Sequence, residues 1–138
     1  MLEEIFREHL QIFLSNYSPQ IFKQLVKDLS FSINKYRMKQ VYNKYKYPRN
    51  NKRVLFWETG GMPGLLKIDA IIAFSLMIRG FDVHMVLCDG TYKACIRRSI
   101  REKTPISEWP KLCQNCKYET KKVVDLFNLP YSYIGDYI

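Results

Sequence analysis

The sequence predicts an α/β fold in which a helical segment precedes a parallel sheet of about three strands. Three observations support this prediction. Apolar residues recur at helical spacing over the first 47 residues. From residue 53 onward, short apolar runs typical of buried strands alternate with helical stretches. A glycine-rich segment, residues 60–64, separates the first of these runs from the helix that follows, which makes a Rossmann-like βαβ unit.

The length and composition suit one soluble domain. The chain has 138 residues, of which 47% are hydrophobic and 25% are charged. The longest nearly apolar run, residues 70–78, is shorter than a membrane span. The acidic start, with Glu3, Glu4 and Glu8, is unlike a signal peptide. We therefore expect a cytoplasmic protein whose cysteines are thiols or metal ligands.

Residues 1–47 are predicted to form a basic helical segment. One helix is expected over Glu3 to Leu14, and a second should begin at Ser18-Pro19, where serine caps the helix and proline occupies its first turn. Residues 1–53 contain 11 Lys or Arg against 4 Asp or Glu. This charge should attract phosphates of nucleic acid, lipid headgroups or a substrate, although a solvated basic face is the simpler interpretation.

After a polar linker at residues 48–52, residues 53–138 are predicted to form the Rossmann-like domain. Strands are expected at 54–57, 83–87 and 131–134, and helices at 65–79, 92–101 and 121–129. A sheet of three strands has an exposed edge. The sequence stops soon after the third strand, so we expect a truncated domain that a further domain or a partner chain completes.

The end of the first strand is the first candidate site. Glu58 lies there, beside Gly60, Gly61, Met62 and Gly64, at the edge where open α/β sheets bind ligands. Glu58 could act as a general base or orient a hydroxyl group, or it could be a solvated or capping carboxylate. The glycines could admit a ligand or only allow tight packing. They do not match the dinucleotide-binding pattern, which disfavours a nicotinamide or flavin site.

Two further groups could contact a substrate. Asp89 follows the second strand and could mimic the acidic residue that binds a ribose in dinucleotide sites. Arg97 and Arg98, with Arg101, form a basic patch that could contact a phosphate-bearing substrate or an anionic membrane, or simply face solvent. His84, in the middle of the second strand, is expected to be a hydrogen-bonded core residue.

Four cysteines form a candidate metal site. Cys113 and Cys116 have the C-x2-C spacing of a zinc half-site, which we expect in a loop, and Cys88 and Cys95 could complete four thiolate ligands. The metal would be structural zinc or, as a second choice, an iron–sulfur cluster. Thiols without metal and a redox C-x-x-C pair are the alternatives.

Several segments together resemble a known family, the bacterial glycosyltransferases of surface-carbohydrate and capsule polysaccharide biosynthesis. The resemblance covers residues 53–138 and rests on Leu55-Phe56-Trp57-Glu58-Thr59-Gly60-Gly61-Met62-Pro63, Gly80-Phe81-Asp82-Val83-His84, Cys88-Asp89-Gly90, Ala94-Cys95, Cys113-x-x-Cys116 and Leu129-Pro130-Tyr131-Ser132-Tyr133.

This resemblance implies the N-terminal, acceptor-side half of a two-domain GT-B enzyme. The loop at residues 60–64 would then face the cleft between the domains, and Glu58 would be the catalytic or acceptor-contacting carboxylate. The acceptor would be a carbohydrate or a lipid-linked sugar, and the basic helices would bring the protein to the inner face of the membrane. A nucleotide sugar would bind only if the second domain is present.

A binding function without catalysis is the alternative. Tyrosines and lysines alternate from Tyr36 to Tyr47, and together with the net charge and the possible zinc knuckle they suggest a nucleic-acid-binding module. Such a module would bind single strands in a strongly salt-dependent way.

Overall fold

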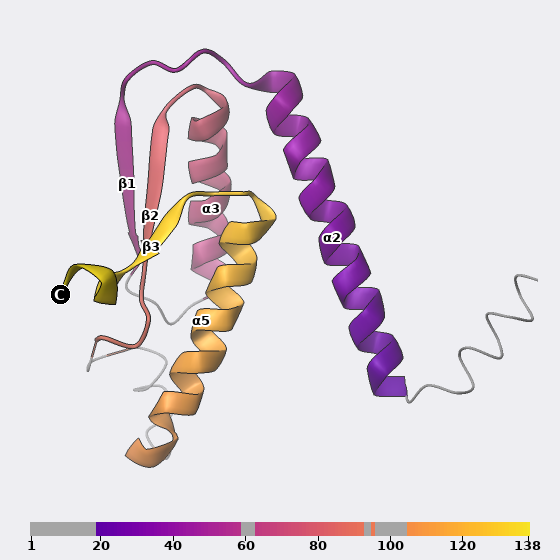
Figure 1. The fold of residues 1–138 in the computed structure, drawn as a ribbon, viewed down its shortest axis with the longest axis vertical. Coiled ribbons are helices and arrows are strands. Elements are labelled where there is room, and N and C mark those ends of the chain that lie inside the picture. The colour runs from indigo at the N-terminus through magenta and orange to yellow at the C-terminus, as the bar shows by residue number, and fades with distance from the viewer. Residues whose placement is uncertain (1–18, 59–62, 93–94, 96–104) are drawn as a thin grey trace, which may run out of the picture. The chain divides into compact units, whose positions relative to one another are not determined.

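The computed structural model describes residues 19–58, 63–92, 95 and 105–138 and confirms the predicted α/β fold (Figure 1). A long N-terminal helix precedes a three-stranded, all-parallel sheet with interleaved helices. Residues 1–34 and 35–138 form two compact units. The predicted helix over residues 3–14 and most of the one over residues 92–101 lie outside the described residues.

The N-terminal helix, α2 (Pro19–Tyr45), begins where the Ser18-Pro19 signal predicts. Toward its C-terminus, Met38, Val41 and Tyr42 pack against the core of the sheet domain. Residues 46–52 contain no helix or strand, but backbone hydrogen bonds tie them to the end of the next helix. The amide of Tyr47 donates to the carbonyl of Ile78 at 2.7 Å.

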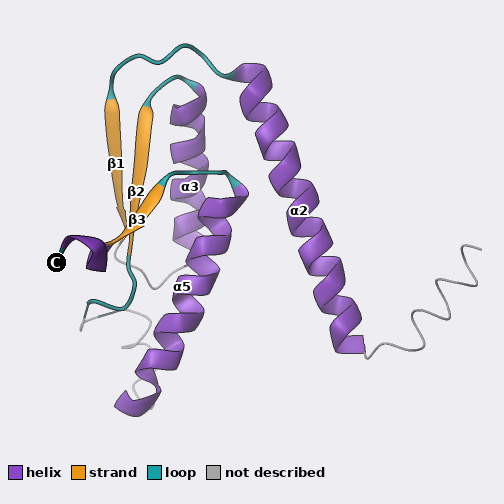
Figure 2. Ribbon diagram, viewed as in Figure 1, coloured by secondary structure: helices purple, strands orange, loops and turns teal. Residues whose placement is uncertain are grey.

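The sheet has the order β1-β2-β3, with β1 (Arg53–Glu58), β2 (Asp82–Leu87) and β3 (Tyr131–Tyr133) all parallel. Helix α3 (Pro63–Ile78) connects the first two strands, and α5 (Trp109–Leu126) leads into the third. The two helices pack against each other and lie on the same face of the sheet (Figure 2). Both crossovers run in the same direction along the sheet, and because such connections are generally right-handed, their helices are expected on the same face.

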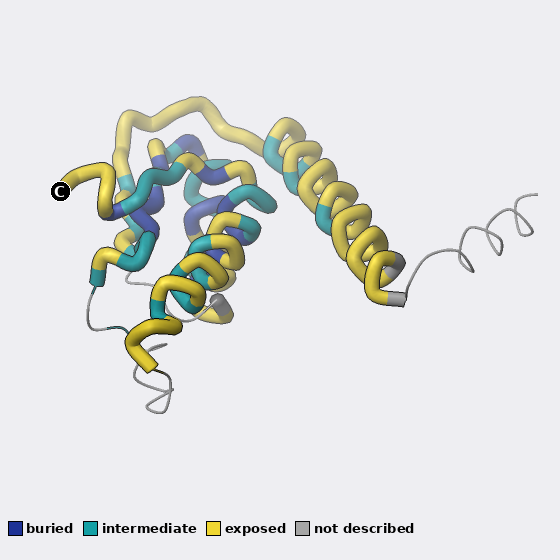
Figure 3. The backbone as a smooth tube through the Cα atoms, turned by 60° about the horizontal axis from the view of Figure 1, so that its bottom comes forward, coloured by how far each residue is buried: buried dark blue, intermediate teal, exposed yellow. Residues whose placement is uncertain are grey.

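The core lies between this sheet face and the two helices (Figure 3). Alternation along β2 directs Val83, Met85 and Leu87 toward the helices. The buried residues that pack with them come from α3, α5 and the turn before β3: Leu66, Ala70, Ala73, Phe74, Val123, Val124 and Leu129.

The opposite sheet face is only partly covered. Leu55 and Trp57 of β1 are 60% and 52% exposed there. His84 Nε2 and Ser132 Oγ are 2.8 Å apart, and the same hydroxyl oxygen is 2.8 Å from the hydroxyl of Tyr137. His84 is thus hydrogen-bonded, as expected, but it is half-buried on the face away from the core, so the expectation of a core residue is wrong.

Helix α5 differs from its prediction because it begins at Trp109 rather than at Lys121. Pro110 in its first turn starts the helix, a role that proline fills because the first amide has no intrahelical acceptor. The C-x2-C pair therefore lies on a helix, and the expectation of a loop is wrong. Among the described residues, no helix is long and apolar enough to span a membrane.

Candidate functional site

The strand register brings three chain segments to one edge of the sheet. Glu58 pairs with Leu87, and Leu87 pairs with Tyr133, so β1, β2 and β3 end side by side. Neighbouring strands are about 4.8 Å apart. Residues just beyond these ends therefore share the carboxyl edge, which is the ligand-binding edge of open parallel sheets.

Glu58 is paired with a second carboxyl group at this edge. Its side chain is half-buried at the end of β1, where it hydrogen-bonds with Asp69 of α3. Burial, followed by the hydrogen bond with Asp69 and the negative charge of Asp69, together raise the pKa of Glu58 from 4.5 to about 7. A carboxyl group with a pKa near 7 exchanges a proton readily at neutral pH, as a general base must.

Asp89 lies in a tight turn after β2. Its carboxylate accepts hydrogen bonds from the hydroxyl and the amide of Thr91. These bonds lower the pKa of Asp89, mainly through the Thr91 hydroxyl, and the positive charge of Lys117 contributes. Gly90 has a φ of 105°, which favours glycine. A Cβ at Gly135, after β3, would overlap the Asp89 carboxylate, so glycine permits the close approach of these two segments.

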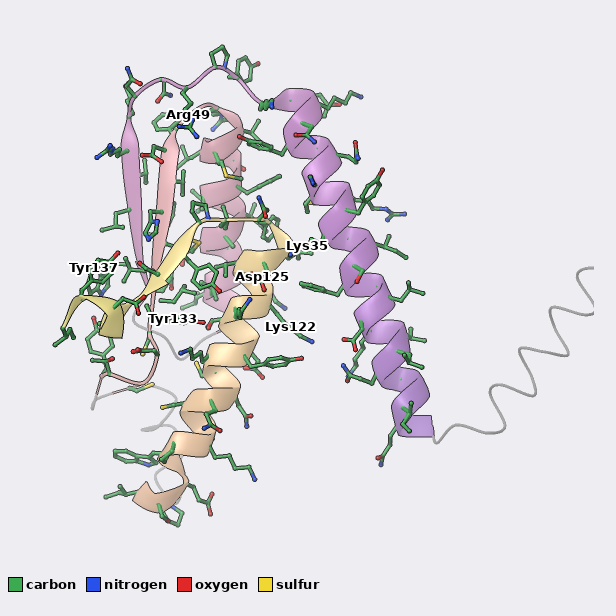
Figure 4. The ribbon with its side chains drawn as sticks, in the orientation of Figure 1. Lys35, Arg49, Lys122, Asp125, Tyr133 and Tyr137 are labelled. Carbon is green, nitrogen blue, oxygen red and sulfur yellow. The ribbon has the colours of Figure 1, made fainter. Side chains whose placement is uncertain are left out.

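A cavity of about 520 Å³ opens beside this turn. It is lined by the Asp89 turn, by the first turns of α5 and by the start of the short 3-10 helix before α5 (Ile106–Glu108). The lining residues are Asp89, Gly90, Ile106, Trp109, Pro110, Cys113, Gln114 and Lys117. The ammonium of Lys117 lies 4.0 Å from the ring centre of Tyr133, a cation–π contact that links α5 to the end of β3. Figure 4 labels Tyr133 at this place.

The lining combines the groups that bind a neutral, hydroxyl-rich molecule. The Asp89 carboxylate accepts hydrogen bonds, and the Gln114 amide both donates and accepts them. Trp109 and Pro110 supply apolar surface. Mostly apolar walls with a few convergent polar groups are typical of small-molecule sites. Glu58 belongs to the neighbouring strand end and is not among the described residues that line the cavity.

The remaining predicted substrate contacts are only partly visible. Gly60, Gly61, Met62, Arg97 and Arg98 lie outside the described residues. Gly64 is exposed in the first turn of α3, and a Cβ there would meet nothing within 4 Å. Tight packing therefore does not account for the glycine at position 64.

The four cysteines are all described, and all are half-buried. Cys113 and Cys116 lie on α5, Cys88 follows β2, and Cys95 comes seven residues later. Cys88 Sγ accepts a hydrogen bond from the amide of Gly90 at 3.4 Å. Within the described part of the chain, no three His, Cys, Asp or Glu residues are grouped closely enough to hold a metal ion. The zinc or iron–sulfur site stays a prediction.

Sequence reasoning missed two features. Asp69 is the single acidic residue of the mostly apolar helix α3. A helix packed against the sheet would bring Asp69 to the end of β1, and this was the available signal for the partner of Glu58. A second cavity, of about 340 Å³, lies at the amino ends of the strands and is lined by Arg49, Asn51, Arg53, Gly80 and Asp82. The loop geometry that forms it has no sequence signature that we recognise.

Comparison of the chain with known protein families, with curated proteins and with solved structures finds no match. The function is therefore argued from the site and from the sequence resemblance alone.

Proposed function

We propose that this chain is the acceptor-side domain of a GT-B-type glycosyltransferase of cell-surface polysaccharide synthesis. The observation that carries the proposal is the Glu58 carboxyl group at the carboxyl edge, whose pKa burial and Asp69 raise to about 7. This edge belongs to the segment with the sequence resemblance, residues 53–138. A half-buried, paired carboxyl group at a ligand-binding edge is a candidate acid or base with a stated physical cause.

In the proposed reaction, the ionised Glu58 accepts the proton of an acceptor hydroxyl. The hydroxyl oxygen bonds to the anomeric carbon of a nucleotide sugar, and the bond from that carbon to the diphosphate breaks, so the nucleoside diphosphate leaves with the electron pair. Asp69 is a positioning residue, because it hydrogen-bonds Glu58 and sets its protonation. The nucleotide sugar is held by a second domain, on a longer chain or on a partner chain.

The cavity beside Asp89 is the proposed acceptor subsite. Carboxylate and amide groups bind sugar hydroxyls, and an indole ring packs on the apolar face of a sugar. Asp89, Gln114 and Trp109 supply these groups. The acceptor is a carbohydrate, free or lipid-linked, with its reacting hydroxyl extending along the edge toward Glu58. We place this reaction in the cytoplasm.

The partly covered sheet face supports the need for a further domain. Parallel sheets are normally covered on both faces, whereas here Leu55 and Trp57 of β1 are more than half exposed. The second domain or a partner chain would cover this face and add to the free edge of β1.

Carbohydrate binding by the full chain tests the acceptor subsite. A glycan array selects a binding oligosaccharide, and its affinity is then measured by calorimetry for Asp89→Asn and for a matched control, Asp82→Asn. Asp82 is an exposed aspartate that begins β2, at the amino edge of the sheet. We expect at least about tenfold weaker binding for Asp89→Asn, since hydrogen bonds to a charged group contribute about 1.5–3 kcal/mol, and no change for Asp82→Asn.

Two results would count against this function. Equal loss in both variants would mean that the cavity is not the acceptor subsite. Binding of single-stranded nucleic acid at this edge, with steep salt dependence and no glycan binding, would favour the nucleic-acid-binding alternative.

A further inference from the structure

The cavity of about 340 Å³ at the amino ends of the strands lies away from the proposed transferase site. Glu58 and Asp89 lie at or beyond the carboxyl ends of β1 and β2, whereas this cavity lies where both strands begin. A strand of six residues is about 20 Å long. The cavity therefore takes no part in the proposed transferase chemistry. Its lining comes from the segment before β1, from the first residue of β1 and from the turn between α3 and β2: Arg49, Asn51, Arg53, Gly80 and Asp82.

Backbone contacts hold the walls of this cavity. The amide of Asn50 donates a hydrogen bond to the carbonyl of Gly80 at 2.9 Å, and the amide of Asp82 donates to the carbonyl of Lys52 at 2.8 Å. Gly80 has a φ of 86°, and a Cβ there would overlap the carbonyl oxygen of Pro48. The segment before β1 thus lies directly on the turn after α3, and side-chain substitutions within the cavity leave these contacts in place.

Two guanidinium groups in the lining can donate hydrogen bonds to a ligand. Asp82 Oδ2 lies 3.3 Å from Nε of Arg53, which leaves the terminal amino groups of Arg53 for other acceptors. Arg49 is exposed, and its side chain has no hydrogen bond or ion pair with any residue that the structure describes. Figure 4 labels Arg49 at this end of the sheet. The side-chain amide of Asn51 adds a neutral donor.

The charge around the cavity is positive. Residues 44–53 contain five Lys or Arg and no Asp or Glu. Asp82 is the single acidic residue in the lining, and its ion pair with Arg53 offsets one of the two guanidinium charges there. The surrounding cations therefore favour an anionic ligand.

We propose that this cavity binds the phosphate group of a small phosphate monoester. The planar guanidinium fork of arginine matches the oxygens of a phosphate group and binds them with paired hydrogen bonds. A phosphate monoester has three acceptor oxygens, which Arg49, Arg53 and Asn51 can share. The volume is near the lower end for small-molecule sites, so the alcohol part of the ester is small.

The donors and the charge favour a monoester over other anions. A carboxylate has two oxygens and a single negative charge, so one guanidinium group satisfies it. Each phosphodiester of a nucleic acid also carries a single charge, whereas a monoester carries nearly two at neutral pH. A lipid headgroup and a soluble ester can both present this phosphate group.

Calorimetry and vesicle sedimentation with the full chain test the proposal. Glycerol 3-phosphate is the soluble monoester, and succinate is the carboxylate comparison. Vesicles of phosphatidylcholine with phosphatidic acid present the same monoester on a lipid, and phosphatidylcholine alone is their comparison. The variants are Arg49→Gln and Arg53→Gln. Arg37→Gln is the matched control, because Arg37 is an exposed arginine of α2 that does not line the cavity.

We expect the natural sequence to bind a phosphate monoester and to bind succinate at least about tenfold more weakly, because succinate presents its charges on separate carboxylates. Arg49→Gln and Arg53→Gln should each weaken monoester binding about tenfold or more, because charge-assisted hydrogen bonds are lost. Arg37→Gln should bind like the natural sequence, and circular dichroism should show that every variant is folded. Binding of glycerol 3-phosphate assigns the site to a soluble ester, and binding of the phosphatidic acid vesicles alone assigns it to a lipid headgroup.

Three results would overturn the proposal. The first is that neither glycerol 3-phosphate nor the phosphatidic acid vesicles bind. The second is that succinate binds as tightly as the monoester, which would make the cavity a general anion site. The third is an equal loss of binding in Arg37→Gln and Arg49→Gln, which would mean that the net charge of the chain attracts the ligand and that the cavity does not hold it.

Discussion

Replacement of Glu58 by glutamine should remove a pH-dependent part of the folding stability. In the folded chain the pKa of Glu58 is raised from 4.5 to about 7, first by burial and then by Asp69. Between these two pH values the folded state binds a proton that the unfolded state has released. The stabilisation from this proton is complete below pH 4.5 and is lost as the pH rises through about 7.

The magnitude follows from the size of the pKa change. A rise from 4.5 to about 7 corresponds to about 3 kcal/mol for a group shielded from water. Glu58 is only half-buried, so solvent screening reduces the expected effect to about 1–2 kcal/mol. Glutamine stays neutral at every pH and can still donate a hydrogen bond to the Asp69 carboxylate.

Urea unfolding near pH 4.5 and again above pH 7 measures this effect. Between these two pH values the free energy of unfolding of the natural sequence should fall by about 1–2 kcal/mol more than that of Glu58→Gln. The other titrating groups are the same in both proteins, so their contributions cancel in this difference. Glu108→Gln, which changes an exposed carboxylate, is the matched control and should follow the natural sequence. If Glu58→Gln has the same pH dependence as the natural sequence, Glu58 and Asp69 do not share a proton, and the proposed general base loses its physical basis.

Three further outcomes are expected. Gly135→Ala should lower the free energy of unfolding, measured with urea, by about 1–3 kcal/mol, because the added Cβ overlaps the Asp89 carboxylate. It should also shift the NMR signals of the Asp89 turn. Met85→Ala should cost about 2–5 kcal/mol in the same assay, because Met85 is completely buried in the core. The four-cysteine prediction expects one zinc per chain, released by Cys113→Ser, in elemental analysis; four titratable thiols without metal would contradict it.

The sheet domain was predictable from short-range signals. The apolar run before Glu58 and the one ending at Leu87 predict buried parallel strands, and the structure places strands at both. The expected burial on both faces is wrong for β1, an edge strand whose Leu55 and Trp57 are more than half exposed. Gly80 stops α3 with a φ of 86°, as its position after a long apolar run indicates. The predicted start of α5 was wrong, because a proline such as Pro110 can lie in a loop or in the first turn of a helix. The local sequence does not distinguish these two positions.

The site was less predictable, because its properties come from contacts distant in sequence. Glu58 could be placed at the edge from its position after an apolar run, but its raised pKa depends on Asp69, eleven residues later on another element. α5 begins at Trp109, so Lys117 lies on this helix, and its ammonium lies 4.0 Å from the ring centre of Tyr133 at the end of β3. Residue spacing within one helix or strand does not predict contacts between elements that are distant in the sequence.

The carboxyl edge of the sheet carries acidic groups in a chain whose net charge is +9. Glu58, Asp69 and Asp89 lie there, together with the Lys117 ammonium, which lies over the ring of Tyr133. Carboxylates accept hydrogen bonds from hydroxyl groups and an ammonium donates them, so this edge suits a neutral sugar. Added salt should therefore leave glycan binding nearly unchanged, because screening acts between charges and a neutral sugar carries none. If glycan binding falls steeply with added salt, attraction between charges holds the ligand, and the neutral-sugar subsite argued from Asp89 is wrong.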